Sequence, residues 1–372
     1  MPLRMNAWAH RKTDSIGDRQ MKKLHRPSAA LLAMAALGGV STHALGQSSV
    51  TLYGIVDTGL VYQSKTSGNS GALKGALDGG WAPSIWGLKG QEDIGGGTKI
   101  GFALEDGFST TTGQFGNSNG GIFGRHAYVQ ATGGFGDIKA GLQFSPFLLA
   151  IDGRDPRAMS NFASAFTEYL GKVGINGIFD SNSLVYTSPT FAGFTGSVQY
   201  APGGIAGSGV KGRRLSGSLT YAAGPFSADA AYYQAKDTAT GQTAIDGATL
   251  GASYSFESVT GYAFAIRLRN NEVPGNPNYM TYAGGLSWNP SASILLDCGV
   301  YYSKDRSASG SHSLMYSGGA MYSLSRRTSL YAQVALVNNH GGMGTGVAAN
   351  GDLTRIPDGN TLAASVGIQH RF

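Results

Sequence analysis

The last residues of the chain, TLAASVGIQHRF (361–372), alternate between two kinds of side chain up to the terminal Phe372. From Leu362, every second residue is Leu, Ala, Val, Ile, His or Phe, and the interleaved set is Ala, Ser, Gly, Gln and Arg. A strict period of two predicts a β-strand with one apolar and one polar face. Because chain ends fray unless they are tied down, this strand needs a neighbour that pairs with it.

Similar alternating segments recur from Val50 onward, and with the terminal strand they number sixteen. They are 50–62, 84–93, 98–106, 123–132, 136–144, 181–188, 193–200, 214–222, 226–234, 247–256, 260–269, 279–288, 292–303, 313–323, 328–338 and 361–372. No stretch after residue 47 shows a convincing helical period of 3.6. We therefore expect an all-β protein.

The connections between these segments alternate in length along the chain. Short ones such as 94–97 and 223–225 are rich in Gly, Pro and Asn, whereas 63–83, 145–180 and 339–360 are long. An antiparallel barrel set across a membrane has short turns on one side and long loops on the other. A secreted soluble β-sandwich is the alternative, but its Greek-key connections give no reason for such alternation. The pattern predicts a 16-stranded antiparallel transmembrane barrel. To close it, the terminal strand must pair with the first strand, near residues 50–62.

Polar side chains on each segment cannot face lipid and are expected to line a wet interior. In 260–269 the even-numbered residues are Tyr, Phe, Ile and Leu, and the odd-numbered residues include Arg267 and Arg269. This pattern places both arginines inside the barrel. The terminal strand, read in the same way, directs Leu362 to Phe372 toward lipid or a neighbouring subunit and directs Ser365, Gln369 and Arg371 inward.

The N-terminal region reads as a leader rather than as part of the barrel. From Met21 a basic segment precedes the apolar run SAALLAMAALGGV, which is followed by small residues, as in a secretory signal peptide. We place cleavage after Gly46, with cleavage after Ala44 as the alternative, and interpret residues 1–20 as an extension from a start codon assigned too early. A transmembrane anchor would need a longer apolar run. The barrel is then one domain, 47–372.

Without residues 1–46, which hold seven Lys/Arg and two Asp/Glu, the chain keeps 28 − 7 = 21 basic and 22 − 2 = 20 acidic residues. Its formal net charge falls from +6 to +1, so nothing in the charge indicates a nucleic-acid partner. The single cysteine, Cys298, excludes an intramolecular disulfide.

Catalytic and metal-binding patterns are absent or lack their context. GNSNG (116–120) matches the G-x-S-x-G motif of hydrolases, but it lies in a polar loop rather than between a strand and a helix. IGGGTK (94–99) lacks the G-K-[ST] of a phosphate-binding loop, and the histidines show no metal spacing. We expect no enzyme activity and no cofactor.

The connection 145–180 is unusual because it combines acidic residues with many apolar ones. It spans 36 residues and contains Asp152, Asp155 and Glu168 together with several Phe and Leu residues. A loop packed inside the barrel would place the apolar groups against the wall and the carboxylates toward the lumen. The alternative is a surface loop whose apolar tip contacts a partner.

Several stretches together resemble the general diffusion porins of Gram-negative outer membranes, especially those of beta-proteobacteria. They are QSSVTLYGIVDTG (47–59), WGLKGQEDIGGGTKIGFALE (86–105), RHAYVQATGGFGDIKAGLQ (125–143), NSLVYTSPTFAGF (182–194), YSLSRRTSLYAQVALVNN (322–339) and VGIQHRF (366–372). The similarity extends along the whole chain after the leader.

This resemblance implies a homotrimer of 16-stranded barrels in the outer membrane, through which small hydrophilic solutes and ions diffuse passively. The third long loop would fold inward, and its acidic residues would face basic wall residues across a constriction. Arg125 matches a wall arginine of the family and Lys89 a lumen-facing base. Asp152, Asp155 and Glu168 belong to the loop that supplies the acidic side.

The chain also departs from the family pattern at this constriction. The family usually reads S-R-x-G-[FL]-[KR]-G, whereas this chain has SIWGLKG (84–90), so Ile85 stands where an arginine is expected. GLQ (141–143) replaces the common G-R-Q, and Phe179 or Asp180 lies near another usual arginine. We therefore expect a pore that is less anion-selective than its relatives, or weakly cation-selective, with Arg267 and Arg269 as partial compensation.

The resemblance also assigns a role to the last residues. Ile368, His370 and Phe372 match the alternating pattern that the outer-membrane assembly machinery reads, although His370 is less apolar than that pattern usually has. A channel selective for one class of solute remains an alternative to general diffusion. An outer-membrane barrel enzyme is a third possibility, but it would need a nucleophile, a base and oxyanion donors that the sequence does not show together.

Overall fold

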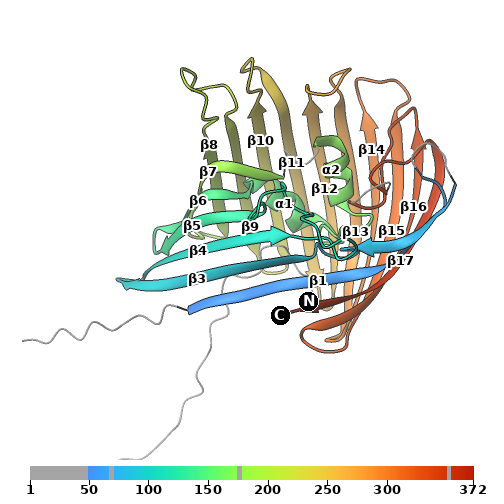
Figure 1. Ribbon diagram of the computed structural model, residues 1–372, viewed down its shortest axis with the longest axis horizontal. Coiled ribbons are helices and arrows are strands. Elements are labelled where there is room, and N and C mark those ends of the chain that lie inside the picture. The colour runs from blue at the N-terminus through green and yellow to red at the C-terminus, as the bar shows by residue number, and fades with distance from the viewer. Residues whose placement is uncertain (1–48, 67–70, 174–177, 350–352) are drawn as a thin grey trace, which may run out of the picture.

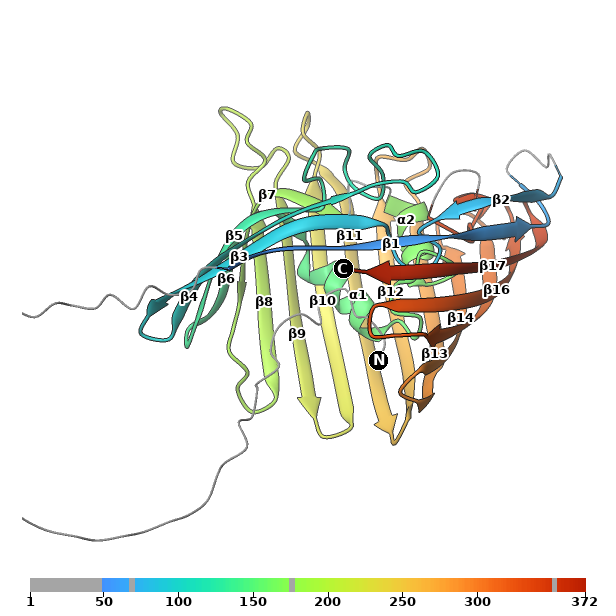
Figure 2. The same cartoon turned by 60° about the horizontal axis from the view of Figure 1, so that its bottom comes forward.

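The computed structural model describes residues 49–66, 71–173, 178–349 and 353–372. Within these residues the chain forms a closed antiparallel barrel of tilted strands (Figures 1 and 2). The predicted leader and signal peptide, residues 1–46, lie outside the described residues.

The strands and helices have the following bounds. The strands are β1 Ser49–Gln63, β2 Leu73–Asp78, β3 Ile85–Gly95, β4 Thr98–Gly107, β5 His126–Gly133, β6 Gly136–Phe144, β7 Phe179–Thr187, β8 Phe194–Ala201, β9 Arg214–Ala223, β10 Phe226–Lys236, β11 Thr243–Phe256, β12 Val259–Asn270, β13 Asn278–Ser291, β14 Ile294–Asp305, β15 His312–Ser323, β16 Thr328–His340 and β17 Gly359–Arg371. The helices are α1 Pro146–Arg154 and α2 Ala165–Val173.

The barrel has sixteen strands because β2 and β3 together occupy one place in the wall. β1 pairs with β2 through Thr58–Gln63 and with β3 through Ser49–Ile55. The segment 79–84 between β2 and β3 interrupts this composite strand. The predicted sixteen-stranded barrel is therefore confirmed, but the expectation that all of 63–83 is a loop was wrong, because β2 forms within it.

The first and last strands close the barrel, as the terminal alternation predicts. β1 pairs with β17 from Ile55↔Arg371 to Gln63↔Ala363, and Gly54 and Phe372 exchange two backbone hydrogen bonds of 3.2 Å. Closure pairs the free edges of the first and last strands with one another, and a closed sheet is the condition for strands to cross a membrane.

The two faces of β17 also agree with the prediction. Leu362, Val366, Ile368 and Phe372 are exposed on the outside of the barrel, whereas Ser365 and Gln369 are buried on the inside. Most other strands show the same pattern, with exposed Leu, Val, Tyr and Phe on one face.

Strand β12 does not follow the expected assignment of faces. Phe264, Ile266 and Leu268 are buried with residues of α1 in the main apolar cluster, and the side chains of Arg267 and Arg269 lie on the opposite, outer face. The register supports this, since Arg267 and Arg269 stand opposite Ala248 and Asp246 on the face of β11 that carries the exposed Leu250. The prediction that these arginines line the interior was wrong.

Two short helices form within 145–180, where the sequence shows no clear helical period. Ser145 caps α1 by accepting a hydrogen bond from the Leu148 N–H at 3.2 Å, and Pro146 occupies the first turn, where a missing N–H costs little. In the described residues, neither helix has the length and apolarity to cross a membrane.

We predict that a side chain at Gly54 would prevent normal closure of the barrel. A Cβ there would lie 2.5 Å from both the Ile85 carbonyl oxygen and Phe372 Cζ, so Gly54→Val is expected to cost about 1–3 kcal/mol. The measurement is the temperature at which the folded band converts to the unfolded band on a denaturing gel.

Gly75→Val is the matched control, because nothing lies within 4 Å of a Cβ at Gly75 in β2. Equal transition temperatures for Gly54→Val and the control would contradict the prediction.

Candidate functional site in the barrel interior

The helices α1 and α2 of the connection 145–180 lie within the ring of strands in Figures 1 and 2. α1 contacts the neighbouring strands β8 to β12, and α2 contacts β12. Phe147, Leu148, Ile151 and Phe162 are fully buried in the apolar cluster that also contains Leu268. The apolar side chains of this connection therefore pack against the wall of the barrel.

Arg154, at the end of α1, attaches the segment to β10 and β11. Its Nε lies 2.5 Å from Asp229 Oδ2, and its Nη atoms donate hydrogen bonds to Ser253 at 2.9 Å and to Ser227 at 2.8 Å. Both charged side chains are almost completely buried. An ion pair that is buried and hydrogen-bonded in this way fixes the position of the chain that carries it.

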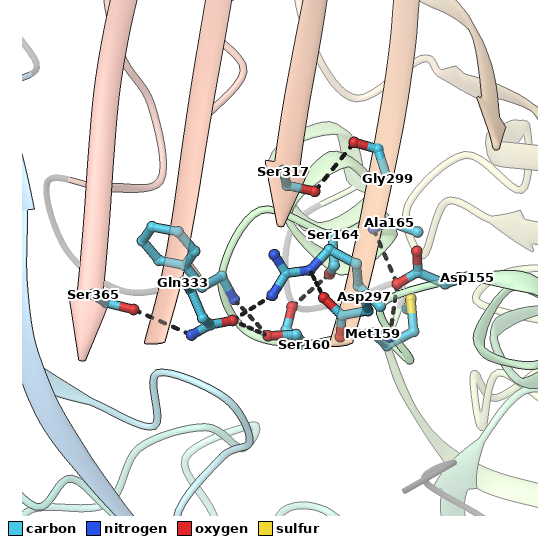
Figure 3. A network of polar contacts seen from close by, with 12 residues as sticks. Asp155, Met159, Ser160, Ser164, Ala165, Asp297, Gly299, Ser317, Gln333 and Ser365 are labelled. Carbon is cyan, nitrogen blue, oxygen red and sulfur yellow. Dashed lines mark hydrogen bonds and ion pairs between the residues drawn. The ribbon is translucent and has the colours of Figure 1, made fainter. Parts of the chain in front are cut away.

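Arg157 attaches the next part of the segment to β14 and β16. Figure 3 shows Ser160 of this segment beside Asp297 and Gln333 of the wall. Its Nε lies 3.4 Å from Asp297 Oδ1, its Nη2 donates to Gln333 Oε1, and its guanidinium lies 5.7 Å from the centre of the Trp81 ring. Ser160 also donates to Gln333 Oε1 at 3.1 Å. Arg157 is fully buried, so Asp297 compensates its charge within the protein.

Asp155, predicted as an acidic residue of the lumen, is instead enclosed by hydrogen bonds. Its carboxylate accepts from Tyr301 Oη at 2.6 Å and from the backbone N–H groups of Met159 at 2.7 Å and Ala165 at 3.3 Å. Burial raises the pKa of the Asp155 carboxyl, although the hydrogen bonds from Tyr301 and Met159 lower it in part. Asp155 therefore shapes the turn between α1 and α2.

Glu168 is likewise buried and paired. Its Oε2 lies 2.6 Å from Lys172 Nζ on the same helix and accepts from Ser303 Oγ at 2.8 Å. Lys172 Nζ also donates to Thr281 at 2.9 Å and to Ser303 at 2.8 Å. The structure thus joins α2 to β13 and β14 through this group. Of the three predicted acidic residues, Asp152 is the one that lines a cavity beside α1.

The structure brings the predicted basic residues Arg125 and Lys89 together on another part of the wall. Arg125 Nε lies 2.8 Å from Glu105 Oε1, and Tyr53 Oη donates to Glu105 Oε2 at 3.0 Å. Lys89 Nζ lies 5.0 Å from the centre of the Tyr53 ring. Glu105, which the sequence reasoning missed, therefore compensates the charge of Arg125.

Ile85, the position where the family pattern has an arginine, is buried on the inner face of β3. It stands opposite Ile55 on β1 and Gly107 on β4, and 8% of its surface is exposed. The side chain adds no charge to this part of the interior.

The segment 79–84 is a further interior element that the sequence reasoning missed. The buried carboxylate of Asp57 accepts from the N–H groups of Gly80 at 3.0 Å, Trp81 at 3.3 Å and Ala82 at 3.0 Å. Tyr331 Oη and Gln369 Nε2 donate to it as well, at 2.6 and 3.0 Å. Asp57 is the single charged residue of the first strand, and this was the available signal.

The last long connection also reaches the segment 145–180. The Ala163 N–H donates to the Val347 carbonyl at 2.8 Å, and the Ala349 N–H donates to the Asn161 carbonyl at 3.0 Å. Val347 and Ala348 are buried. The two connections therefore hold one another through backbone pairing.

Arg267 and Arg269 lie away from this interior, on the outer face near the end of β12. Arg267 Nη1 is 2.9 Å and Arg269 Nε 4.0 Å from the carboxylate of Asp246. Their predicted role as lumen residues does not fit this placement. Among the described residues, no group of three or more His, Cys, Asp or Glu side chains could hold a metal ion.

A closed barrel with apolar strand faces outside and polar groups inside is the architecture of a transmembrane channel. The family model described as Gram-negative porin matches residues 30–342. The chain is 31% identical to outer membrane porin protein 32 of Delftia acidovorans over 92% of this chain and 99% of that protein. It is 27% identical to an outer membrane porin protein of Bordetella pertussis, again over 92% of this chain and 99% of that protein.

Comparison with solved structures also finds similarity to a porin. The anion-selective porin from Comamonas acidovorans superposes with a TM-score of 0.76 at 28% identity, covering 88% of this chain and 100% of that one. The chain belongs to the Gram-negative porin family and is an outer-membrane protein.

We predict that Asp297→Asn loosens the attachment of the segment 145–180. The change leaves the buried Arg157 without its opposite charge, which typically costs about 3–5 kcal/mol. The expected result is greater noise in the open-channel current of single channels in planar bilayers.

Asp93→Asn serves as the control, because Asp93 is exposed near the end of β3 and the amide oxygen of the new Asn side chain can still accept from the Gly95 N–H. If Asp297→Asn and Asp93→Asn gave the same current noise as the unmodified protein, this attachment would have no part in holding the segment.

Proposed function

We propose that the protein forms a water-filled channel in the outer membrane, through which small hydrophilic solutes and ions diffuse passively. The observation that carries this proposal is the closed sixteen-stranded barrel whose interior is polar and partly filled by a tethered segment. In this proposal the segment 145–180 narrows the channel. The purified protein should give stepwise conductance increments in a planar bilayer. The absence of any increment would contradict the proposed channel function.

Trimerisation and processing belong to the same proposal. The family resemblance supports a homotrimer, which would appear as three equal closing steps in single-channel records. Residues 21–46 would be removed on export, so N-terminal sequencing of the outer-membrane form should begin at Gln47. We infer no catalytic activity, because proteins of this family are channels and the sequence offers no set of catalytic groups.

The interior charges support a channel with weak preference between ions. Arg125 is compensated by Glu105, and Arg154 and Arg157 by Asp229 and Asp297. Ile85 adds no positive charge where the family pattern implies an arginine. Anion selectivity is stated for the Comamonas acidovorans porin, and we propose that this chain is less anion-selective or weakly cation-selective.

Ile85→Arg should shift the channel toward anions. The substitution adds a positive charge to the inner face at the position where the family pattern has one, and the reversal potential in a KCl gradient measures the resulting change in selectivity. Ile205→Arg, in the long connection between β8 and β9, controls for the added charge alone. A strongly anion-selective unmodified protein that Ile85→Arg leaves unchanged would refute this proposal.

We also propose that Ile368, His370 and Phe372 form the signal for outer-membrane assembly. Ile368 and Phe372 are exposed on the outer face, and the exposed His370 ring has its Nδ1 2.9 Å from Thr328 Oγ1. An exposed apolar strand at the chain end is accessible for recognition before the barrel closes.

Deletion of Phe372 is expected to lower the amount of folded protein in the outer membrane. The protein would lose both the proposed signal and two backbone hydrogen bonds to Gly54. Quantitative gels of membrane fractions measure this amount, and single-channel conductance of the assembled fraction should not change. Phe191→Ala is the control, since Phe191 is 83% exposed in the turn between β7 and β8. Normal membrane levels of the deletion variant would exclude the role.

A further inference from the structure

A cavity of about 430 Å³ lies between α1 and the inner faces of β8, β9 and β10. Its volume falls within the range of small-molecule sites. It is lined by Pro146, Leu149, Ala150, Asp152, Gly153, Arg154, Ser197, Ser218, Thr220 and Asp229. These residues give the cavity three kinds of lining: charged groups, hydroxyl groups and apolar side chains.

The charged groups of the lining carry a formal excess of negative charge. Asp152 and Asp229 supply two carboxylates and Arg154 one guanidinium, so the sum is −1. Asp152 is 4% exposed. The guanidinium of Arg154 is directed to wall groups, namely Asp229, Ser253 and Ser227. An anion would therefore meet net repulsion here and a cation net attraction.

The hydroxyl groups form a continuous set across neighbouring strands. Ser197 stands directly opposite Ser218 in the β8–β9 register, and Thr220 stands opposite Asp229 in the β9–β10 register. Directly opposite residues share a face and lie close together. Ser197 Oγ already shares a hydrogen bond of 2.6 Å with Thr187 Oγ1. Because a hydroxyl can donate one hydrogen bond and accept two, this surface still suits a solute with several hydroxyl groups.

The third kind of lining is the apolar side of α1, where Pro146, Leu149 and Ala150 line the cavity. Apolar carbon lining suits the C–H face of a sugar ring, because contact there removes apolar surface from water.

Resting on the proposed channel function, we propose that this cavity is a weak binding site for small cationic polyhydroxylated solutes of the amino-sugar class. The ammonium group would lie near Asp152, the sugar hydroxyls along Ser197, Ser218 and Thr220, and the ring against Leu149. A site in a channel must bind weakly enough to release its solute again.

The test compares D-glucosamine, D-glucose and D-glucuronate, which share a ring and differ mainly in charge. Each sugar is added at slightly acidic pH to single channels conducting KCl, and the concentration that gives half of the maximal reduction in current is measured. We expect glucosamine to act at a concentration about two- to fivefold lower than glucose, because the cost of removing water from the ammonium group offsets most of its attraction to the carboxylates. Glucuronate should be weaker than glucose.

Variants then test whether the reduction in current arises from binding in this cavity. Asp152→Asn should remove the preference for glucosamine over glucose, and Ser218→Ala should weaken the effect of both sugars. Asp93→Asn removes an exposed carboxylate elsewhere and should leave the preference intact. Heat-dependent mobility on a gel establishes that each variant is folded. If Asp152→Asn does not fold, Ser218→Ala alone tests whether the cavity binds the sugars.

The outcomes separate this inference from the proposed function. Normal conductance with equal effects of all three sugars, or a glucosamine preference that both Asp152→Asn and Ser218→Ala leave unchanged, would overturn the site but not the channel. Absence of conductance from folded protein would overturn the channel itself.

Discussion

The pairing of β1 with β17 is the contact on which the rest of the structure depends. In the hydrocarbon of a bilayer no water satisfies backbone N–H and C=O groups, so strands can cross only in a sheet without edges. The register from Ile55↔Arg371 to Gln63↔Ala363 supplies that closure. Closure also fixes which face of each strand is inside, because side chains alternate strictly along a strand. The polar interior follows from this one pairing of β1 with β17.

The interior is then modified by what the long connections place in it. The segment 145–180 brings Phe147, Leu148 and Ile151 against the wall, so the wall there must be apolar on its inner face. β12 meets this need with Phe264, Ile266 and Leu268. This is why the face assignment of Arg267 and Arg269 failed: the rule that polar residues line the interior holds only where water fills it.

Much of the barrel could be predicted from the sequence, because a period of two is a local property of each strand. The sixteen strands, the closure through the terminal strand and the faces of β17 are of this kind. The pairing of β2 with β1 and the turn around Asp57 could not be predicted, since they depend on contacts between distant residues. The enclosure of Asp155 by Tyr301 and nearby backbone N–H groups has the same origin.

The distribution of charge shows how the interior segment can be held firmly and still leave a polar passage. The resemblance implies acidic groups on the loop facing basic groups on the wall. In two attachments the charges are the other way round: the segment carries Arg154 and Arg157, and the wall carries their partners Asp229 and Asp297. Buried charges are tolerated only when they are paired, so these arginines fix the segment and contribute little net field. Because the charges of these pairs cancel locally, a single unpaired charge on the inner surface has more influence on permeating ions than the paired charges have. We therefore expect two places to set the selectivity of this chain: the inner face at Ile85, which lacks a positive charge, and the cavity beside α1, where the charges sum to −1.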